Sequence, residues 1–366
     1  MMMRLLSMFK RQVLDIPLLL GVLALMGTSI VVLYSATNEN AEMVFSQVIR
    51  TVVALIVMFA MASIPPKLYA RWAFAGYILC TLLLVAVLVA GHVGKGAERW
   101  LDLGIIRFQP SEFMKIIMPM TIAAFFARRV LPARLLPCIA AIMLILLPVG
   151  LIVMQPDLGT AVLITVSGSF IVYLAGLNWY LILSLTGLAV LYAPIHWFFF
   201  MYDYQKHRII TFLNPESDPL NKGYNIIQSK IAIGSGGPLG KGWLQGTQSH
   251  LQFLPESHTD FIFAVYCEEF GFAGFLFLMA LYAAVIARCA YISLNAQNTF
   301  ERLLSGALTL TFFFYIFVNV GMVSGLLPVV GVPLPMISYG GTSMITLSAA
   351  FGIIMAIRTH HKKQSF

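Results

Sequence analysis

Residues 16–35 read IPLLLGVLALMGTSIVVLYS, a run of 20 residues without a single charged side chain. A helix of this length rises about 30 Å, which matches the hydrocarbon core of a bilayer. Comparable apolar runs recur along the whole chain, and short polar segments separate them. The sequence therefore predicts an all-α, polytopic integral membrane protein. No small-residue cleavage site follows the first run, so we interpret it as a span rather than a signal peptide.

The composition of the 366-residue chain supports this fold class. Hydrophobic residues make up 60% of the chain and charged residues 10%, whereas ordinary soluble domains have about 45–50% and about 25%. This composition excludes a soluble enzyme, a disordered chain and a fibrous repeat. Because the apolar runs extend along the whole chain, we treat residues 1–366 as a single membrane domain.

The apolar runs predict about ten transmembrane helices and one large extracytoplasmic loop. This loop, at about 201–260, joins the seventh and eighth spans and is too long for a simple connection. We interpret it as a folded, functional loop on the outer membrane face. The predicted spans are 16–35, 47–64, 73–91, 111–127, 136–154, 159–176, 179–200, 261–287, 303–324 and 337–357.

Lysine and arginine set the predicted orientation, because they favour cytoplasmic loops. With a cytoplasmic N-terminus, 13 of the 23 basic residues lie inside, five lie in or beside short outer segments and five lie in the long loop. Both termini are therefore expected in the cytoplasm. Of the 15 acidic residues, 13 lie on the outer side or within spans, as expected for chemistry at the outer face.

Several other sites and partners are not expected. The net charge of +8 is spread over short loops, without the aromatic-interleaved basic stripe that would indicate nucleic-acid binding. The four cysteines are isolated and lack metal-ligand or redox spacing. We interpret them as small apolar core residues. They are Cys80, Cys138, Cys267 and Cys289.

A glycine-rich run, IGSGGPLGKGWLQG at 233–246, lies within the long loop. It fails the phosphate-loop pattern, because Ser235 replaces the first glycine and Gly242 replaces the Ser or Thr after Lys241. ATPase activity is therefore not expected. Two interpretations remain open: a backbone nest for a pyrophosphate, or glycines that permit tight turns.

The segment LPESHTDFIF at 254–263 carries Asp260 where the long loop enters the eighth span. A carboxylate at a membrane boundary is costly unless it is solvated or paired. One interpretation is that Thr259 or Asp260 caps the helix. That interpretation leaves Glu256 and His258, which crowd the same turn, unexplained. The alternative is a functional site.

Two further polar motifs begin predicted spans. Glu112 and Lys115, three residues apart after Gln109-Pro110, face each other on a helix. They form either a self-neutralised pair or a site in which the lysine faces an anionic substrate. Asp157, in QPDLGT at 155–160, either caps the sixth span or lines the same outer site.

Several segments, taken in order, resemble the SEDS family, named for shape, elongation, division and sporulation. They are MISYGGTS at 336–343 with the residues from Asn319 to Val332 before it, the loop blocks 212–219, 223–229 and 254–263, the QPSE–Lys115 motif and QPDLGT. The resemblance covers about residues 12–358. WLQGTQS in the loop and the short termini are similar to the rod-shape branch rather than the division branch.

This resemblance implies a peptidoglycan glycosyltransferase of the bacterial inner membrane, with its active site on the periplasmic face. The implied substrate is lipid II, polymerised during lateral cell-wall elongation. The implied partners are an elongation class B penicillin-binding protein and other elongation-complex proteins. It also implies a divalent cation, Mg²⁺ or Mn²⁺, although the sequence shows no protein cage for a metal. No organic cofactor is expected.

Carried onto this sequence, the family's catalytic carboxylate is Asp260, which we expect to act as the general base for the acceptor GlcNAc 4-hydroxyl. Glu112, Lys115, Asp157, Glu256 and His258 are candidate substrate-binding residues. In the same loop as Asp260, Lys206 and Arg208 are candidates for stabilising the leaving pyrophosphate. Two rival functions are a lipid II flippase and a non-catalytic scaffold for the penicillin-binding protein.

Overall fold

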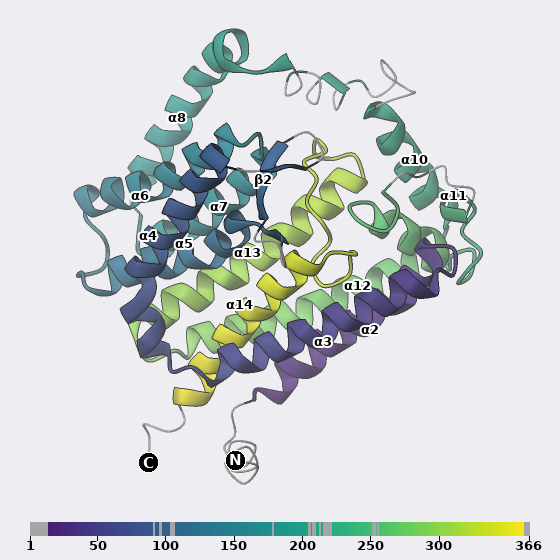
Figure 1. The fold of residues 1–366 in the computed structure, drawn as a ribbon, viewed down its shortest axis with the longest axis horizontal. Coiled ribbons are helices and arrows are strands. Elements are labelled where there is room, and N and C mark those ends of the chain that lie inside the picture. The colour runs from purple at the N-terminus through teal and green to yellow at the C-terminus, as the bar shows by residue number, and fades with distance from the viewer. Residues whose placement is uncertain are drawn as a thin grey trace.

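The computed structural model describes residues 14–90, 92–94, 97–102, 107–177, 179–203, 222–250 and 256–361, together with positions 206, 210, 211, 214 and 254. Its principal elements are helices that pack side by side in a bundle (Figure 1). In chain order the helices are α2 (Ile16–Ala36), α3 (Ala41–Ser63), α4 (Pro66–Ala90), α5 (Pro110–Ala127), α6 (Leu135–Met154), α7 (Leu158–Leu174), α8 (Trp179–Ile195), the π-helix η1 (His196–Phe200), α10 (Lys222–Ser235), α11 (Thr247–His250), α12 (Ile262–Leu294), α13 (Thr299–Val323) and α14 (Gly341–His361).

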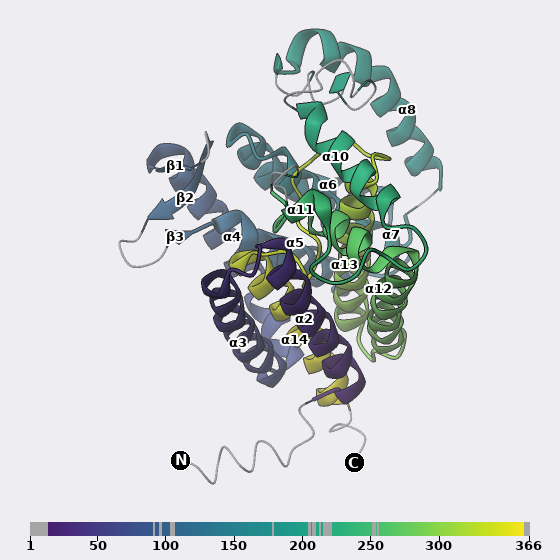
Figure 2. The same cartoon turned by 90° about the vertical axis from the view of Figure 1, so that its right-hand side faces the viewer.

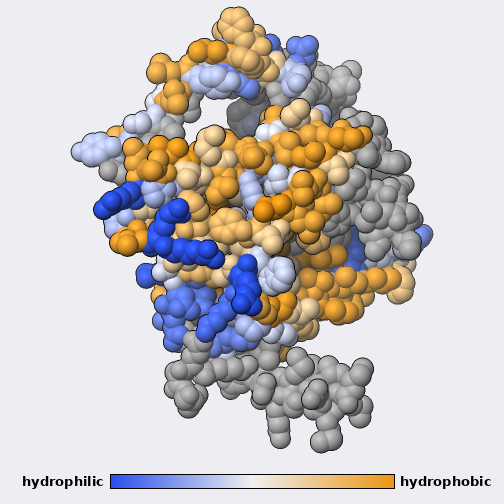
Figure 3. Space-filling model, turned by 60° about the vertical axis from the view of Figure 1, so that its left-hand side comes forward, coloured by the Kyte–Doolittle hydropathy of each residue, from blue (hydrophilic) through white to orange (hydrophobic). Residues whose placement is uncertain are grey.

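Apolar helices confirm a multi-pass membrane protein. Within the described ranges, seven helices are long and apolar enough to cross a membrane: α2, α3, α4, α6, α12, α13 and α14. Three shorter or more polar elements, α5, α7 and α8 with η1, occupy the other three predicted spans. The count of ten crossings therefore stays a prediction. Much of the surface in Figure 3 is hydrophobic, while strongly hydrophilic residues gather toward the end where the termini emerge.

Polar caps decide where some of these helices begin. The Asn40 side chain accepts hydrogen bonds from the backbone N–H groups of Glu42 and Met43, each at 3.1 Å, and so satisfies two N–H groups that a helix leaves unpaired. The second span was predicted from residue 47, but α3 begins at Ala41 because of this cap.

The bundle is organised around α13. This helix packs against α5, α7 and α12, while α14 lies along α3 and α2 lies along α12. The N-terminal end of α2 and the C-terminal end of α14 lie at the same end of the molecule in Figures 1 and 2, which we call the end of the termini. In both views α8 and η1 extend away from the other helices. The site described below lies toward the end of the bundle opposite the termini.

The segment 324–340, between α13 and α14, is not helical and yet lies inside the bundle. Met336 and Ile337 are buried. Tyr282 lies well inside α12, about 18 Å from its C-terminal end at 1.5 Å per residue. Its hydroxyl donates to the carbonyl of Pro335 at 2.7 Å. Non-helical backbone is tolerated at this depth only where protein groups satisfy it. The segment is therefore a re-entrant connection, and we call 324–340 the re-entrant segment.

The glycine-rich run packs backbone to backbone against α12. A Cβ atom at Gly236 would collide with the carbonyl of Cys267, and one at Gly240 with the carbonyl of Glu269. The N–H groups of Lys241 and Gly242 donate to carbonyls of α12 at 3.0 Å each. Since these N–H groups are already used, the structure favours close packing and turns over a pyrophosphate nest for this run.

A small antiparallel sheet accompanies the helices of the predicted membrane fold. It consists of β1 (His92–Gly94), β2 (Ala97–Asp102) and β3 (Arg107–Phe108), in the order β1-β2-β3. The sheet connects α4 to α5, in the region where the sequence departs from the alternation of spans and short turns. It therefore lies at the same end of the bundle as the start of α5.

Candidate active site

Asp260 lies two residues before the first residue of α12. The structure assigns the N-cap position to Phe261, which makes no side-chain capping bond, so neither Thr259 nor Asp260 occupies the N-cap position. The main chain of Asp260 is fixed instead by α13, because the Asn319 amide donates to the Asp260 carbonyl at 2.9 Å and to the Val332 carbonyl at 2.7 Å. Asn319 is fully buried, whereas Asp260 is partly exposed.

The re-entrant segment approaches the Asp260 carboxylate closely. A Cβ atom at Gly331 would lie 3.5 Å from Asp260 Oδ2, and Gly331 has a φ of +79°, a conformation that favours glycine. The Ser338 hydroxyl donates to the Thr259 carbonyl at 2.6 Å. The carboxylate is therefore placed by backbone contacts on both sides of it.

Glu256 and His258 form the turn that presents Asp260. The Glu256 carbonyl accepts from the N–H groups of Thr259 and Phe261 at 3.1 and 3.3 Å, and its carboxylate accepts from the Thr259 hydroxyl at 2.7 Å. Glu256 itself has a φ of +58°. The carbonyl of His258 accepts from the re-entrant segment, through the N–H of Tyr339 at 2.9 Å. Both residues thus shape the turn.

An arginine reaches the same turn from α3. The guanidinium of Arg50 lies 4.1 Å from the centre of the Tyr339 ring, and the edge of that ring meets the His258 ring at 5.9 Å between centroids. Arg50 is the tenth residue of an apolar helix, and among the described residues no carboxylate lies within 4.0 Å of it. A cation at this depth is costly and generally marks a functional site.

Glu112 and Lys115 form a buried ion pair on α5, with 2.6 Å between Oε1 and Nζ. Thr346 of α14 also donates to Glu112, at 3.4 Å. The ammonium lies 5.7 Å from the centre of the Tyr315 ring. Beside them a narrow cavity of about 20 Å³, measured as space open to the centre of a water molecule, is lined by Lys115, Tyr315 and Thr311. That space suffices for about one water molecule.

Asp157 caps α7, as one of the two interpretations predicted. Its carboxylate accepts from the N–H of Thr160 at 3.3 Å, and the Gln109 amide donates to its other oxygen at 3.3 Å. Gln109 immediately precedes α5, so this bond joins the start of α5 to the start of α7. The cap role and a place beside the Glu112–Lys115 pair are therefore compatible.

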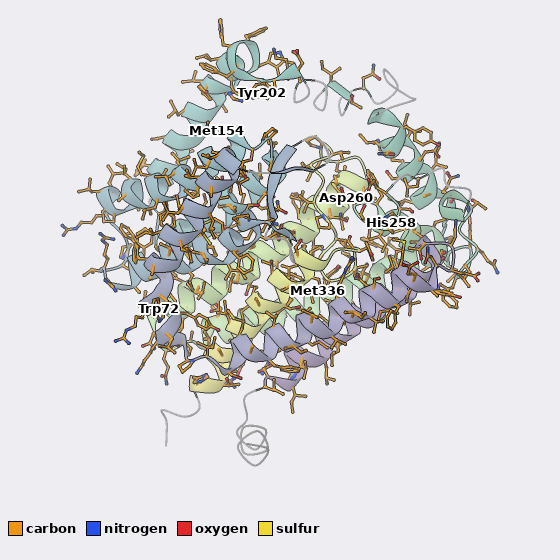
Figure 4. All side chains as sticks on the ribbon, in the orientation of Figure 1. Trp72, Met154, Tyr202, His258, Asp260 and Met336 are labelled. Carbon is orange, nitrogen blue, oxygen red and sulfur yellow. The ribbon has the colours of Figure 1, made fainter. Side chains whose placement is uncertain are left out.

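These groups converge on one end of the bundle. Tyr315 and Asn319 are four residues apart on α13, about one helical turn, so the face that meets Lys115 continues to the residue that holds Asp260. Beside them, a Cβ atom at Gly159 of α7 would lie 3.0 Å from the carbonyl of Val330, the residue before Gly331. Figure 4 shows Asp260 and His258 close together where α12 begins.

Two of the predicted residues are not placed in this group. Lys206 lies one turn from Tyr202, whose carbonyl accepts its N–H at 3.1 Å. In Figure 4 Tyr202 lies near the top of the view, apart from Asp260. Arg208 lies outside the described residues. The lysine of the glycine-rich run, Lys241, has a structural partner, because it forms an ion pair with the buried Glu268 at 2.7 Å.

The described residues do not fit a protein-built metal site. Within them, no three His, Cys, Asp or Glu side chains gather closely enough to hold an ion. The carboxylates of Glu112 and Asp157 already accept hydrogen bonds from Lys115 and Gln109. No chemical step is therefore derived through a metal.

Arg50, Asn319 and Tyr339 are site residues that the sequence interpretation gave no role. Arg50 carried a usable signal, since it lies inside the predicted span 47–64 and a charge within an apolar span indicates function. Asn319 and Tyr339 belong to the motifs that resemble the family. Asn319 contacts Asp260 across a sequence separation of 59 positions, and Tyr339 contacts His258 across 81 positions. Periodicity does not predict contacts at such separations.

The fold and this site define a multi-pass membrane protein with a carboxylate and cation centre near one membrane face. The chain belongs to the FTSW_RODA_SPOVE family, described as "Cell cycle protein", whose model matches residues 8–363. This confirms the SEDS resemblance of the motifs.

Similar proteins span nearly the whole chain. It is 53% identical over 352 residues to the peptidoglycan glycosyltransferase MrdB of Escherichia coli K12, covering 96% of this chain and 95% of that protein. A solved chain from a peptidoglycan synthase complex that coordinates polymerization and crosslinking matches with a TM-score of 0.83 and 31% identity, covering 94% of this chain and 97% of that one. The rod shape determining protein RodA of Thermus thermophilus matches with a TM-score of 0.70 and 28% identity, covering 94% and 96%.

Proposed function

We propose that this chain is a peptidoglycan glycosyltransferase that polymerises lipid II into glycan strands, with Asp260 as the general base. Its family relatives are named as enzymes of this class. The observation that carries the residue assignment is that Asp260 is partly exposed while its turn is held in place. Bonds from α13 and from the re-entrant segment to the backbone carbonyls of Asp260 and Thr259 hold this turn. A base that must accept a proton from a substrate hydroxyl needs both access and a fixed position.

The chemistry is a single displacement at the anomeric carbon of the donor. Asp260 takes the proton from the GlcNAc 4-hydroxyl of the acceptor, and that oxygen forms a bond to the anomeric carbon. The bond from this carbon to the pyrophosphate oxygen breaks, and undecaprenyl pyrophosphate leaves with the electron pair. Conversion of an α-linked pyrophosphate into a β-link inverts the configuration, so one carboxylate base suffices without a covalent intermediate.

Among the described basic residues of this site, Arg50 is the best-placed cation for the leaving pyrophosphate. Lys115 is already neutralised by Glu112, whereas Arg50 has no carboxylate partner among the residues that the structure describes and contacts the ring that packs on His258. Guanidinium groups bind phosphate oxygens through two parallel hydrogen bonds. We assign Arg50 to the pyrophosphate and the Glu112–Lys115 pair to the same substrate surface. The Mg²⁺ or Mn²⁺ dependence implied by the family then rests on ions held mainly by substrate phosphates.

The location and partner follow from the same function. The protein acts in the bacterial inner membrane, with cytoplasmic termini and the Asp260 site on the periplasmic face. It works with a class B penicillin-binding protein of the elongation machinery. Support for a partner comes from the similarity to a chain of a peptidoglycan synthase complex.

Purified full-length chain supplied with lipid II and a divalent cation tests this function. We expect the purified chain to make glycan strands that are visible on a denaturing gel. Adding the penicillin-binding protein should increase the amount of product. A protein that moves labelled lipid II across proteoliposomes without making strands would be a flippase. A chain that yields no strands in either arm and moves no lipid II would be a scaffold.

A further inference from the structure

A second polar pocket lies at the opposite end of the bundle, where both termini emerge (Figure 1). It is lined by the start of α2, the later part of α12 and the end of α14, and its volume is about 210 Å³. We call it the arginine pocket, because Arg288 and Arg358 contribute its positive charges. Its volume is roughly 14 to 21 times the 10–15 Å³ that one water molecule requires.

The arginine pocket holds a net positive charge. Asp15 accepts two hydrogen bonds from Arg288, at 2.9 Å from Nε and 2.6 Å from Nη2, and a third from the N–H of Leu18 at 3.1 Å. Its charge is therefore used by Arg288. Arg358 has no carboxylate within 4.0 Å in the described part of the chain. Arg358 also attracts Asp15 electrostatically without forming an ion pair with it, so two guanidinium groups share a single carboxylate and the pocket keeps a net positive charge.

The two guanidinium groups are held near one another by a shared aromatic ring. Arg288 lies 5.0 Å and Arg358 5.7 Å from the centre of the Tyr291 ring. Such contacts restrict the side chains at low cost. Arg288 still has N–H donors that its bonds to Asp15 do not use, since a guanidinium carries five. Two restrained guanidinium groups with spare donors match the oxygens of a phosphate.

The rim of the arginine pocket combines this charge with apolar surface. Ile16 and Pro17 line the pocket, and Ile16 is 63% exposed at the first turn of a helix apolar enough to cross the membrane. A group bound there has its phosphate against arginine and its neighbouring atoms against lipid-facing side chains. Basic pockets between membrane-spanning helices on the cytoplasmic side are typical binding places for anionic headgroups.

We propose that the arginine pocket binds the phosphate group of an anionic ligand. The apolar rim favours a lipid headgroup as the source of that phosphate, in the leaflet on the side of the termini. The alternative is that the Asp15–Arg288 pair only fastens α2 to α12 and that Arg358 is merely solvated. The two differ in what the unpaired arginine does, because the fastening role does not require Arg358.

The test uses the purified full-length chain in detergent and the variant Arg358→Gln, which leaves the Asp15–Arg288 pair intact. Arg71→Gln is the matched control, because it removes one exposed positive charge at the start of α4, outside the pocket. Thermal unfolding and native mass spectrometry are recorded with phosphatidylglycerol, with zwitterionic phosphatidylcholine and with inorganic phosphate.

We expect phosphatidylglycerol to bind and protect the wild-type chain, and Arg358→Gln to bind it about 5- to 10-fold more weakly, as for loss of one arginine near a charged headgroup. Arg71→Gln should bind as the wild type does. Protection by inorganic phosphate that Arg358→Gln loses would assign the pocket to a soluble phosphate instead of a lipid. Equal phosphatidylglycerol binding by wild type and Arg358→Gln, or equal weakening by Arg71→Gln, would overturn the proposal.

Discussion

Replacing Asn319 by leucine tests whether α13 positions the catalytic carboxylate. Leucine keeps roughly the size of the side chain but removes both donated hydrogen bonds, to the carbonyls of Asp260 and Val332. Each hydrogen bond contributes about 1 kcal/mol net, and each buried carbonyl left unpaired costs about 1–3 kcal/mol. We therefore expect Asn319→Leu to lower the free energy of unfolding by about 2–6 kcal/mol.

The same change should lower activity in the protein that remains folded. Freed from Asn319, the main chain at Asp260 can shift, and a displacement of about 1 Å can reduce a rate by roughly 10²-fold. Lipid II polymerisation is measured on monodisperse protein over a range of substrate concentrations. We expect kcat to fall by about that factor while KM changes little, because the cations that bind pyrophosphate are untouched.

Ser305→Ala supplies the control for Asn319→Leu. Ser305 is also fully buried on α13 and donates to the carbonyl of Glu301 at 2.6 Å, but it lies 14 residues from Asn319, about 21 Å along the helix. This variant should keep the wild-type kcat. Wild-type kcat in Asn319→Leu, or equal loss in both variants, would refute the positioning role.

Three further outcomes follow from contacts elsewhere in the chain. Glu268→Ala removes the buried carboxylate that pairs with Lys241 and accepts from the N–H groups of Thr247 and Gln248. The segment 241–248 should become protease-sensitive, and the free energy of unfolding should fall by about 1–3 kcal/mol for each of the two N–H groups left unpaired; unchanged proteolysis would contradict this. Burial raises the pKa of Asp15, but hydrogen bonds and charge from Arg288 outweigh that effect and hold its pKa below the usual value. The difference in unfolding temperature between wild type and Asp15→Asn should therefore be full at pH 7 and shrink as the pH falls below about 4, whereas a constant difference would argue against the pair. Because the four native cysteines are buried, an impermeant thiol reagent on spheroplasts should label Leu239→Cys and not Gln297→Cys, and the reverse pattern would invert the topology.

The positions of the helices were largely predictable from the sequence. An apolar run of about 20 residues has few ways to satisfy its backbone in a membrane other than as a helix, so α2 and α6 begin and end within a residue of the predicted spans 16–35 and 136–154. The start of α3 differed because a polar cap at Asn40, rather than hydrophobicity, sets it. The small sheet was not predicted, because its strands are too short to show a clear alternation.

The candidate site was predicted only in part. Motif order placed Asp260, Glu112, Lys115 and Asp157 at the same membrane face, because each begins a span. The contact of Arg50 with Tyr339 joins positions 289 residues apart, so local pattern gives no information about it. The re-entrant segment was also missed, since its hydrophobic residues are those of any short connection between spans and its depth is set by partners such as Tyr282.

Polymerisation of lipid II by the purified Asp260→Asn variant tests the central assignment most directly. Asparagine keeps the size of the side chain but cannot take up the proton of the acceptor hydroxyl. A positioned general base contributes roughly 10²–10⁴-fold, which corresponds to about 3–5 kcal/mol of barrier. We predict a folded, monodisperse protein whose rate is lower by that factor. A rate near that of the wild type would contradict the account, because Asp260 would then have no part in proton transfer.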